Sequence, residues 1–243
     1  MSKGFATTDA RLPAYVRLRD TLTARIAAGD WTPDWPIPSE ARLAREFDVS
    51  VGTVRKAVDG LVGEGLLERR QGSGTYLRAP SFNATLFRFF PMRGGGGEPL
   101  SIPQSKMILR SVTEGPAEAA EALGTEDVIK IVRLRSLSDQ PVLFEEIYIP
   151  RARFAGFETL PDTAFGPLLY PTYFEHFGVL VKRATDEVSF GRASDVVAQQ
   201  LHIKTDDPLA VICRTAFDVE DRPVEWRIAS GSAEGFLYRS EIN

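Results

Sequence analysis

The sequence of 243 residues has very little of the chemistry that metal sites and disulfides need. It contains one cysteine, Cys213, and two histidines, His176 and His202. A single cysteine cannot form an internal disulfide, and these three side chains lack the spacing of a zinc site. We therefore expect no metal, no disulfide and no cofactor, and the composition is consistent with a reducing, cytoplasmic setting.

Long apolar runs are also absent. No stretch approaches the ~18 consecutive apolar residues that a membrane-spanning helix needs. The segment Met1–Leu12 lacks the charged start and hydrophobic core of a signal peptide. We expect a soluble protein with no membrane partner and no targeting segment.

The chain has no excess of basic charge. Its formal net charge is −4, with 12 Lys and Arg against 10 Asp and Glu in residues 1–79, and 17 against 23 in the remainder. Bulk charge therefore does not indicate a nucleic-acid partner, and only a local basic face could bind one. The length and the hydrophobic content of 43% are sufficient for two domains, each with its own core.

The first part of the chain predicts three helices. From Pro13 to Gly29, apolar residues recur at helical spacing, and prolines prevent any continuation. Ser39 is a good N-cap for a second helix, and Ser50 for a third that follows after a short break. The expected core positions are Tyr15, Leu18, Leu22, Ile26, Leu43, Ala44, Phe47, Val54, Ala57, Val58 and Leu61. Two short helices joined by a tight turn indicate a helix-turn-helix unit.

A hairpin is expected directly after the third helix. Two short extended runs, 66–70 and 75–77, flank the tip Gln71-Gly72-Ser73-Gly74. Glycine lets the backbone approach a phosphate strand or enter a minor groove, and Arg69 and Arg70 supply positive charge. The alternative is a plain turn. A nucleotide-binding loop is excluded because neither a Gly-Lys-Ser/Thr ending nor a following helix is present.

These elements together resemble the winged helix-turn-helix of the GntR family of bacterial repressors. The resemblance depends on Pro38-Ser39-Glu40, Val49-Ser50, Thr53-Val54-Arg55, Glu64-Gly65-Leu66 and the run Gly72–Tyr76. It implies that residues 1–78 form a DNA-binding domain and that the partner is a double-stranded operator. The expected DNA-binding residues are Ser39, Arg42, Ser50, Val51, Gly52, Thr53, Arg55, Lys56, Arg70, Gly72, Ser73, Gly74 and Thr75.

Two positions depart from the pattern of the family. Many members have a guanine-reading arginine after Pro-Ser-Glu and another after Val-Ser, where this chain has Ala41 and Val51. Arg55 is retained, and Arg42 lies one position along. A bidentate arginine contact to guanine contributes ~1–3 kcal/mol of discrimination, so we expect altered or looser base reading. Val51 can instead pack on a thymine methyl group.

The larger part of the chain reads as an α+β domain. After the polar link Arg78–Ser81, runs of period two alternate with brief helical segments. The glycine run Gly94–Gly97 is expected to form a mobile loop, with a lid over a pocket as the alternative.

An internal repeat is visible in this part. Residues 117–149 give a short helix, an acidic loop, a strand ending at Arg133, a turn at Asp139 and a second strand. Residues 194–230 give the same order, with a strand ending at Arg214 and a turn at Asp221. Two similar units predict a pseudo-symmetric sheet with a cleft where they meet.

Charged residues fall on an apolar face of this sheet. Alternation places Glu145 on the same face as Leu143, Ile147 and Ile149, and the preceding strand offers Arg133 and Arg135. A buried carboxylate needs such partners. One interpretation is a structural ion pair that fixes strand register. The other is a ligand site to which Glu225 of the second repeat also contributes.

The same segment resembles the UTRA effector domain of HutC-type GntR regulators, over about Phe82 to Tyr238. Its marks are Arg133-Leu134-Arg135, Asp139-x-Pro141-Val142 with Glu145, Tyr148-x-Pro150, Tyr170 before Phe177-Gly178, and Asp221-x-Pro223-Val224-Glu225. The resemblance implies a fold like chorismate lyase over residues 79–243, dimerisation through this domain, and an effector pocket. It assigns anion contacts to Arg133 and Arg135 and polar contacts to Glu145 and Glu225, and it places Tyr170 among the residues that line the pocket.

Two further differences from the pattern of the family concern which effector is bound. Sensors of sugar phosphates in this family tend to have serine where this chain has Leu168, and their Tyr-Arg-Gly-Asp-Arg-Tyr ending is here Gly231-Ser-Ala-Glu-Gly-Phe236. These losses favour a carboxylate-bearing or more apolar metabolite over a sugar phosphate.

Three functions are therefore compared. The first is a homodimeric repressor that leaves a palindromic operator when an anionic metabolite binds. The second is an enzyme of lyase-like fold fused to a DNA-binding domain, although the sequence offers no activated nucleophile and no metal set. The third is a nucleoid-type binder without effector control, which would leave the charged cluster without a role.

Overall fold

The computed structural model describes residues 11–27, 30–32, 35–78, 104–137, 139–234 and 236. The chain divides into two compact units, the first made mainly of residues 1–80 and the second of residues 81–217 and 223–243. The predicted loop at Gly94–Gly97 lies outside the described residues. The domain boundary after residue 78 stays a prediction.

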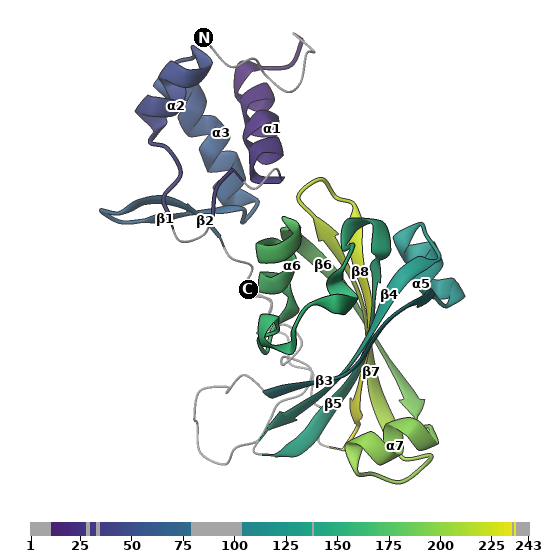
Figure 1. The fold of residues 1–243 in the computed structure, drawn as a ribbon. Coiled ribbons are helices and arrows are strands. Elements are labelled where there is room, and N and C mark those ends of the chain that lie inside the picture. Colours follow the sequence, from purple (N-terminus) through teal and green to yellow (C-terminus); the bar gives the residue numbers. More distant parts are fainter. Residues whose placement is uncertain are drawn as a thin grey trace. The chain divides into compact units, whose positions relative to one another are not determined.

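The first unit is a winged helix-turn-helix. Its helices are α1 (Ala14–Ala27), α2 (Glu40–Phe47) and α3 (Val51–Gly63), and its hairpin pairs β1 (Leu67–Arg70) with β2 (Gly74–Leu77) (Figure 1). All three expected helices and the hairpin are confirmed.

Two serines begin the second and third helices, as expected. Ser39 Oγ accepts the Arg42 amide at 3.3 Å, and Ser50 Oγ accepts the Thr53 amide at 3.1 Å. Asp48 ends α2 in the left-handed conformation, with φ 53°, which makes the turn tight. The expected apolar residues are buried, except that Tyr15 is 40% exposed at the edge of this core.

The wing is held against the segment that precedes α2. Gly74 has φ 127°, and a Cβ at this position would stand 3.1 Å from Pro36 Cβ. Pro36 forms a β-bridge with Tyr76, and the Ile37 amide donates to the Thr75 carbonyl at 2.8 Å. Glycine is therefore required at position 74 for close approach, and at the tip Gly72 has φ 71°.

The second unit contains one six-stranded sheet in the order β3-β4-β5-β8-β7-β6. The first repeat is β3 (Gln104–Glu114), α5 (Ala117–Leu123), β4 (Asp127–Leu137) and β5 (Gln140–Pro150); the second is β6 (Val181–Arg192), α7 (Asp195–Leu201), β7 (Pro208–Asp218) and β8 (Pro223–Ser232). The predicted internal repeat is confirmed, and β5 and β8 meet at the centre of the sheet.

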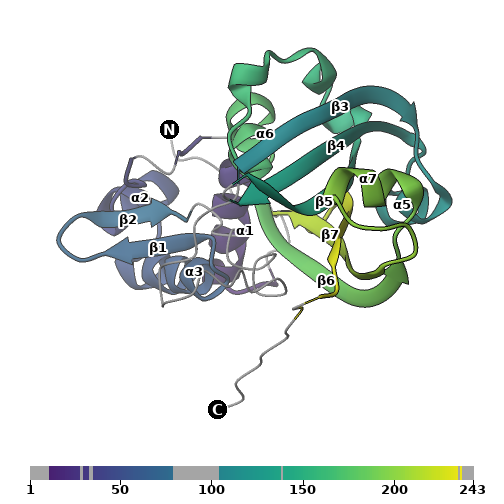
Figure 2. The ribbon, with the colours of Figure 1, turned by 90° about the horizontal axis from the view of Figure 1, so that it is seen from below.

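Helices cover both faces of the sheet (Figure 1, Figure 2). On one face α5 packs on β8 and α7 packs on β5, so each helix covers the central strand of the other repeat. On the other face lies α6 (Leu169–Phe177), which follows three short 3-10 turns at 151–153, 157–159 and 162–164. The core under α6 contains Ile129, Ile131, Ile147, Ile149, Phe154, Phe157, Leu169 and Tyr173.

The strands that carry the arginines are longer than expected. β4 ends at Leu137 and β7 at Asp218, whereas the sequence predicted ends at Arg133 and Arg214. A buried arginine interrupts a strand pattern read by hydropathy alone. Here each guanidinium meets a carboxylate on an adjacent strand, so the strand continues through it.

Candidate functional site

The expected recognition residues lie on the first two turns of α3. Val51, Gly52, Arg55 and Lys56 are exposed, with Val51 41% exposed. Thr53 is half-buried, and its hydroxyl is 2.9 Å from Ser50 Oγ. The surface they form presents small and cationic groups, which can approach the edges of bases.

Glu40 joins this helix to the wing, a role that the sequence analysis did not assign. Its Oε2 accepts Arg55 Nε at 3.0 Å, and its Oε1 accepts Arg69 Nη2 at 3.1 Å. Arg69 Nη2 also lies 2.7 Å from Asp59 Oδ1 of α3. One carboxylate at the start of α2 therefore fixes the directions of two arginines that project from other elements.

The tip of the wing is exposed and polar. Gly72, Ser73 and Gly74 are exposed, and Ser73 Oγ lies 2.6 Å from the hydroxyl of Tyr76. Arg70 stacks over the ring of Tyr76 at 4.0 Å. Thr75 is half-buried behind the tip.

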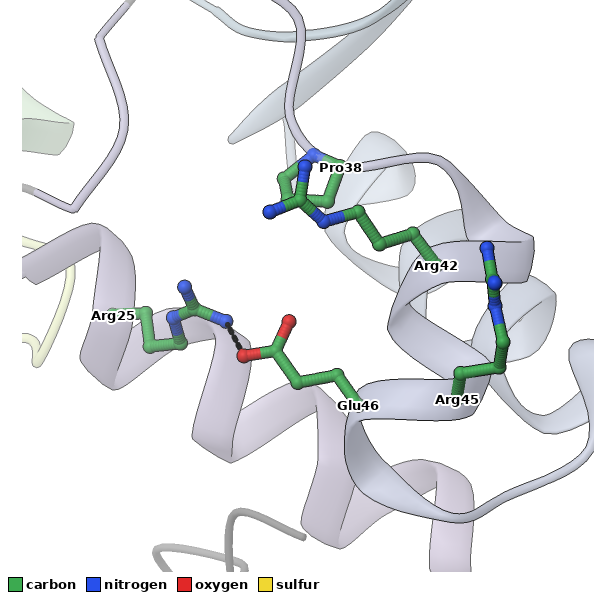
Figure 3. Close-up of a pocket in the computed structure, with 5 residues that line it drawn as sticks. All are labelled: Arg25, Pro38, Arg42, Arg45 and Glu46. Carbon is green, nitrogen blue, oxygen red and sulfur yellow. Dashed lines mark hydrogen bonds and ion pairs between the residues drawn. The ribbon is translucent and has the colours of Figure 1, made fainter. Parts of the chain in front are cut away.

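A hollow of about 550 Å³ lies between α1 and α2 (Figure 3). Its walls are Arg25, Pro38, Arg42, Arg45 and Glu46. Glu46 accepts Arg25 Nη1 at 3.0 Å, and Arg42 and Arg45 are exposed beside that pair. Arg45 was missed by the sequence analysis, although its i,i+3 spacing from Arg42 places both on one helix face.

The second unit gathers the other set of expected residues in a buried ionic cluster. Arg133 donates to Glu145 Oε2 through Nε at 3.0 Å and Nη2 at 2.6 Å, and the two residues are directly opposite each other on β4 and β5. Arg135 Nη1 is 3.9 Å from the same oxygen. Arg133, Arg135 and Glu145 are at most 2% exposed, so the three charges are screened from water.

Glu225 joins this cluster through Arg227, which the sequence analysis missed. Arg227 Nη1 donates to Glu145 Oε1 at 3.0 Å, and its Nη2 donates to Glu225 Oε2 at 3.0 Å. The hydroxyls of Tyr170 and Tyr173 donate to Glu225 at 3.2 and 2.6 Å. The signal was alternation along the strand after Pro223, which places Glu225 and Arg227 on one face.

Arg214 extends the cluster toward the edge of the sheet. It forms a bidentate pair with Asp186 of β6, at 2.6 and 2.7 Å, and stands opposite Arg227 on β8. The described part of the cluster therefore holds four guanidiniums, on Arg133, Arg135, Arg214 and Arg227, against three carboxylates, on Glu145, Glu225 and Asp186.

Two effects determine the pKa values in the cluster. Burial disfavours the charged form of each group, and neighbouring groups of opposite charge favour it. Burial alone would raise the pKa of Glu145, but Arg133, Arg227 and Arg135 outweigh it and lower the pKa to about 2. Burial lowers the pKa of Arg135 to about 10. Burial also acts to lower the pKa of Arg227, but Glu225 and Glu145 reverse this and raise it. The carboxylate of Glu145 is therefore ionised at neutral pH.

This arrangement can bind an additional anion. Within the described residues, Arg133 Nη1 and Arg227 Nε are buried and have no hydrogen-bond partner. An unsatisfied charged donor in a dry interior is costly, and an acceptor from a ligand would relieve that cost. The same described residues contain no cluster of three or more potential metal-binding side chains. None of their helices is long and apolar enough to cross a membrane.

Comparisons with known proteins give the same division of the chain. Residues 14–77 match the model of bacterial regulatory proteins of the gntR family, and residues 101–234 match the UTRA domain. The chain is 30% identical over 209 residues to the HTH-type transcriptional repressor NagR of Bacillus subtilis strain 168, covering 85% of each protein. It is 27% identical over 212 residues to a fructoselysine utilization operon repressor of Escherichia coli K12, designated probable, covering 86% of each.

Solved structures agree with this assignment. A GntR-family transcriptional regulator from Bacillus cereus matches with a TM-score of 0.51 and 25% identity, covering 59% of this chain and all of that one. PhnF from Mycobacterium smegmatis matches with a TM-score of 0.52 and 21% identity, covering 93% and 98%, and supports the fold alone. The relatives are named as regulators of transcription, and this excludes the enzyme interpretation. The chain belongs to the gntR family of bacterial regulatory proteins and is a DNA-binding transcriptional regulator with a UTRA domain.

Proposed function

We propose that this regulator is a cytoplasmic repressor that binds a palindromic operator as a homodimer and releases it when a small anionic metabolite enters the cluster of the second unit. The observation that carries the proposal is that two buried guanidinium nitrogens of that cluster, Arg133 Nη1 and Arg227 Nε, have no hydrogen-bond partner among the described residues. A buried donor without an acceptor is costly, and an acceptor group of a ligand would relieve that cost. Coupling of ~1–3 kcal/mol between the two sites suffices for release.

Operator contacts are assigned by position on the first unit. Arg55, Lys56 and Val51 would read bases in the major groove, and the Gly72–Gly74 tip would enter the minor groove near Arg70. The capped amino ends of α2 and α3, at Ser39 and Ser50, present backbone amides to phosphates. The hollow bordered by Arg42 and Arg45 adds a cationic surface for the DNA backbone. Gly52, Ser73 and Thr75 stay predicted contacts.

Effector contacts are assigned to the cluster. Arg133 and Arg135 would bind the anionic group of the metabolite, since guanidinium matches carboxylate bidentately. Tyr170, Glu145 and Glu225 would orient it through the hydrogen bonds that already join them to the arginines or to each other.

Loss of both Arg133 and Arg135 should leave operator binding intact but weaken the release of the operator by the effector. The Arg133→Met/Arg135→Met variant is expected to bind its operator but to need about 100-fold more effector for release, because two charge-assisted contacts are lost. Arg227 still pairs with Glu145 in this variant, so that carboxylate keeps a partner. Operator sites would be selected from random DNA, and release by small acids measured by fluorescence anisotropy.

The matched control is Lys130→Met, which removes a cation from the opposite face of β4. Lys130 pairs with Glu146, away from the cluster. Normal release from the double variant would make the arginines structural and place the effector elsewhere.

The edge strand β6 is the proposed dimer surface. Its residues 187–192 are all exposed, and they include Val188 at 40% and Phe190 at 69%. An exposed edge with large apolar side chains is a ready surface for pairing with a second chain. A homodimer of this kind of regulator is expected to bind half-sites about one helical turn apart, ~34 Å, as helix-turn-helix dimers do.

Charged side chains introduced on the β6 edge should dissociate the proposed dimer into monomers. Val188→Lys/Phe190→Lys is expected to sediment as a monomer and to lose the advantage of the full palindrome over one half-site. Val196→Lys is the control, because Val196 is 61% exposed but lies on α7, which packs on the central strand β5. A double variant that stays dimeric in sedimentation would assign the interface to another surface.

A further inference from the structure

Arg227 lies at a position where the two repeats carry side chains of opposite charge. Glu145 and Arg227 each lie four residues after the proline of the equivalent turn, at Pro141 and Pro223. The first repeat therefore has a carboxylate where the second has a guanidinium. Because β5 and β8 are neighbours at the centre of the sheet, the two side chains meet, with Arg227 Nη1 3.0 Å from Glu145 Oε1.

Internal donors occupy nearly all the acceptor capacity of the cluster. Glu145 receives two hydrogen bonds from Arg133 and one from Arg227. Glu225 receives both tyrosine hydroxyls and one contact from Arg227 on each oxygen, at 2.8 and 3.0 Å. Two carboxylates together offer about eight lone-pair positions, and these seven contacts fill almost all of them.

What remains for a ligand is donor capacity in an apolar setting. Among the described residues, Arg133 Nη1 and Arg227 Nε are two buried guanidinium nitrogens beside these carboxylates that lack an acceptor. The same face carries the aliphatic and aromatic core that includes Ile131, Ile147 and Phe154. A ligand with a carboxylate finds donors there, whereas a ligand with many hydroxyls finds few acceptors.

We infer that the effector is a compact monocarboxylate with few or no hydroxyl groups, and that Arg227 determines this specificity by occupying the acceptors of Glu145 and Glu225. This inference rests on the proposed effector site and narrows its ligand class. A single carboxylate has two oxygens, and Arg133 Nη1 and Arg227 Nε are two nitrogens that lack an acceptor. Each buried hydroxyl without an acceptor weakens binding about 5- to 150-fold, so hydroxylated acids of the same size are rejected.

The test compares acids that share a carbon skeleton and charge but differ in hydroxyl groups. The pairs are hexanoate with gluconate, and benzoate with 3,4,5-trihydroxybenzoate. Operator release by the wild-type protein is measured by fluorescence anisotropy, and binding by calorimetry. In at least one pair, the hydroxyl-free acid is expected to act at about one-tenth or less of the concentration that its partner needs. Equal or better action of the hydroxylated acids, or no response to any of the four at millimolar concentration, overturns the inference.

Variants of Arg227 test its role directly. Arg227→Ser releases acceptor positions on both carboxylates, so the preference for the hydroxyl-free acid should fall at least about tenfold. Arg227→Lys keeps the charge in case the serine variant does not fold, and its compact ammonium should shift the preference in the same direction by less. An unchanged preference in a folded variant removes Arg227 from specificity.

The outcome for this inference is separable from that for the proposed function. Suppose that acids no longer release the operator from Arg133→Met/Arg135→Met, and that hydroxylated acids release it from the wild type more readily than hydroxyl-free acids do. The effector site is then correct and the ligand class is wrong. If release is unaffected in that double variant, the proposed site itself is wrong, whichever acid acts.

Discussion

Glu145→Gln lowers the free energy of unfolding of the second unit by about 3–5 kcal/mol at pH 7, because it removes one partner from a fully buried ion cluster. The loss leaves Arg133 and Arg227 facing a neutral amide, although their geometry fits a carboxylate. Urea denaturation followed by the fluorescence of Trp226, which lies on the adjacent strand, measures the change.

Glu146→Gln is the matched control for this substitution. Glu146 is the next residue on β5 and points to the opposite face, where it pairs with Lys130 and its side chain is 34% exposed. A half-exposed pair contributes ~0–1 kcal/mol, so the control should be nearly neutral. Equal effects of the two substitutions would show that the buried cluster contributes no more than a surface pair.

The pH dependence of this difference follows from the pKa of Glu145. The folded-state pKa is about 2, and an exposed glutamate has a pKa of ~4.3. A depressed pKa gives a contribution that is complete above ~4.3 and is lost as the pH falls toward 2. The gap in unfolding free energy between the wild type and Glu145→Gln should therefore narrow below pH ~4.3.

Arg55→Ala is expected to abolish specific operator binding. If Arg55 reads a guanine in each half-site, two contacts of ~1–3 kcal/mol are lost, and the Kd rises at least about 30-fold. Binding to random DNA should change far less, because phosphate contacts are retained. Anisotropy titrations with operator and random duplexes at one salt concentration measure both.

Two further variants test whether base reading by α3 depends on the orientation and identity of its side chains as well as on their charge. Glu40→Gln keeps Arg55 but weakens the contact that directs it, so discrimination should fall while salt dependence stays close to that of the wild type. Val51→Arg should change the preferred base. If selection from random DNA returns the parental operator for Val51→Arg, then residue 51 does not read bases.

Local sequence determined most of the first unit. Ser39 and Ser50 cap helices through their own side chains, and Gly72 and Gly74 supply the positive φ that the wing requires. These signals act over a few residues, so they can be read without a structure. The link from Glu40 to Arg55 and Arg69 could not be read in this way, because it joins residues 15 and 29 positions apart.

In the second unit, too, the local sequence predicted some features and the tertiary structure decided others. Alternation along single strands correctly placed Arg133, Arg135 and Glu145 on one buried face, and the repeated helix and strand order predicted the pseudo-symmetric sheet. Which charges neutralise one another was decided only by the tertiary structure. Arg133 and Arg214 are both the seventh residue of their strands, yet one pairs forward to β5 and the other back to β6.

The physical reason is that pairing of buried charges depends on strand order. The sequence by itself determined which side chains share a face, since that follows from a period of two along each strand. The meeting of β5 and β8 at the centre of the sheet determined that Arg227 lies between Glu145 and Glu225, residues 80 positions apart in the chain. Electrostatic compensation in a dry interior acts over a few ångströms of space, whatever the separation in sequence.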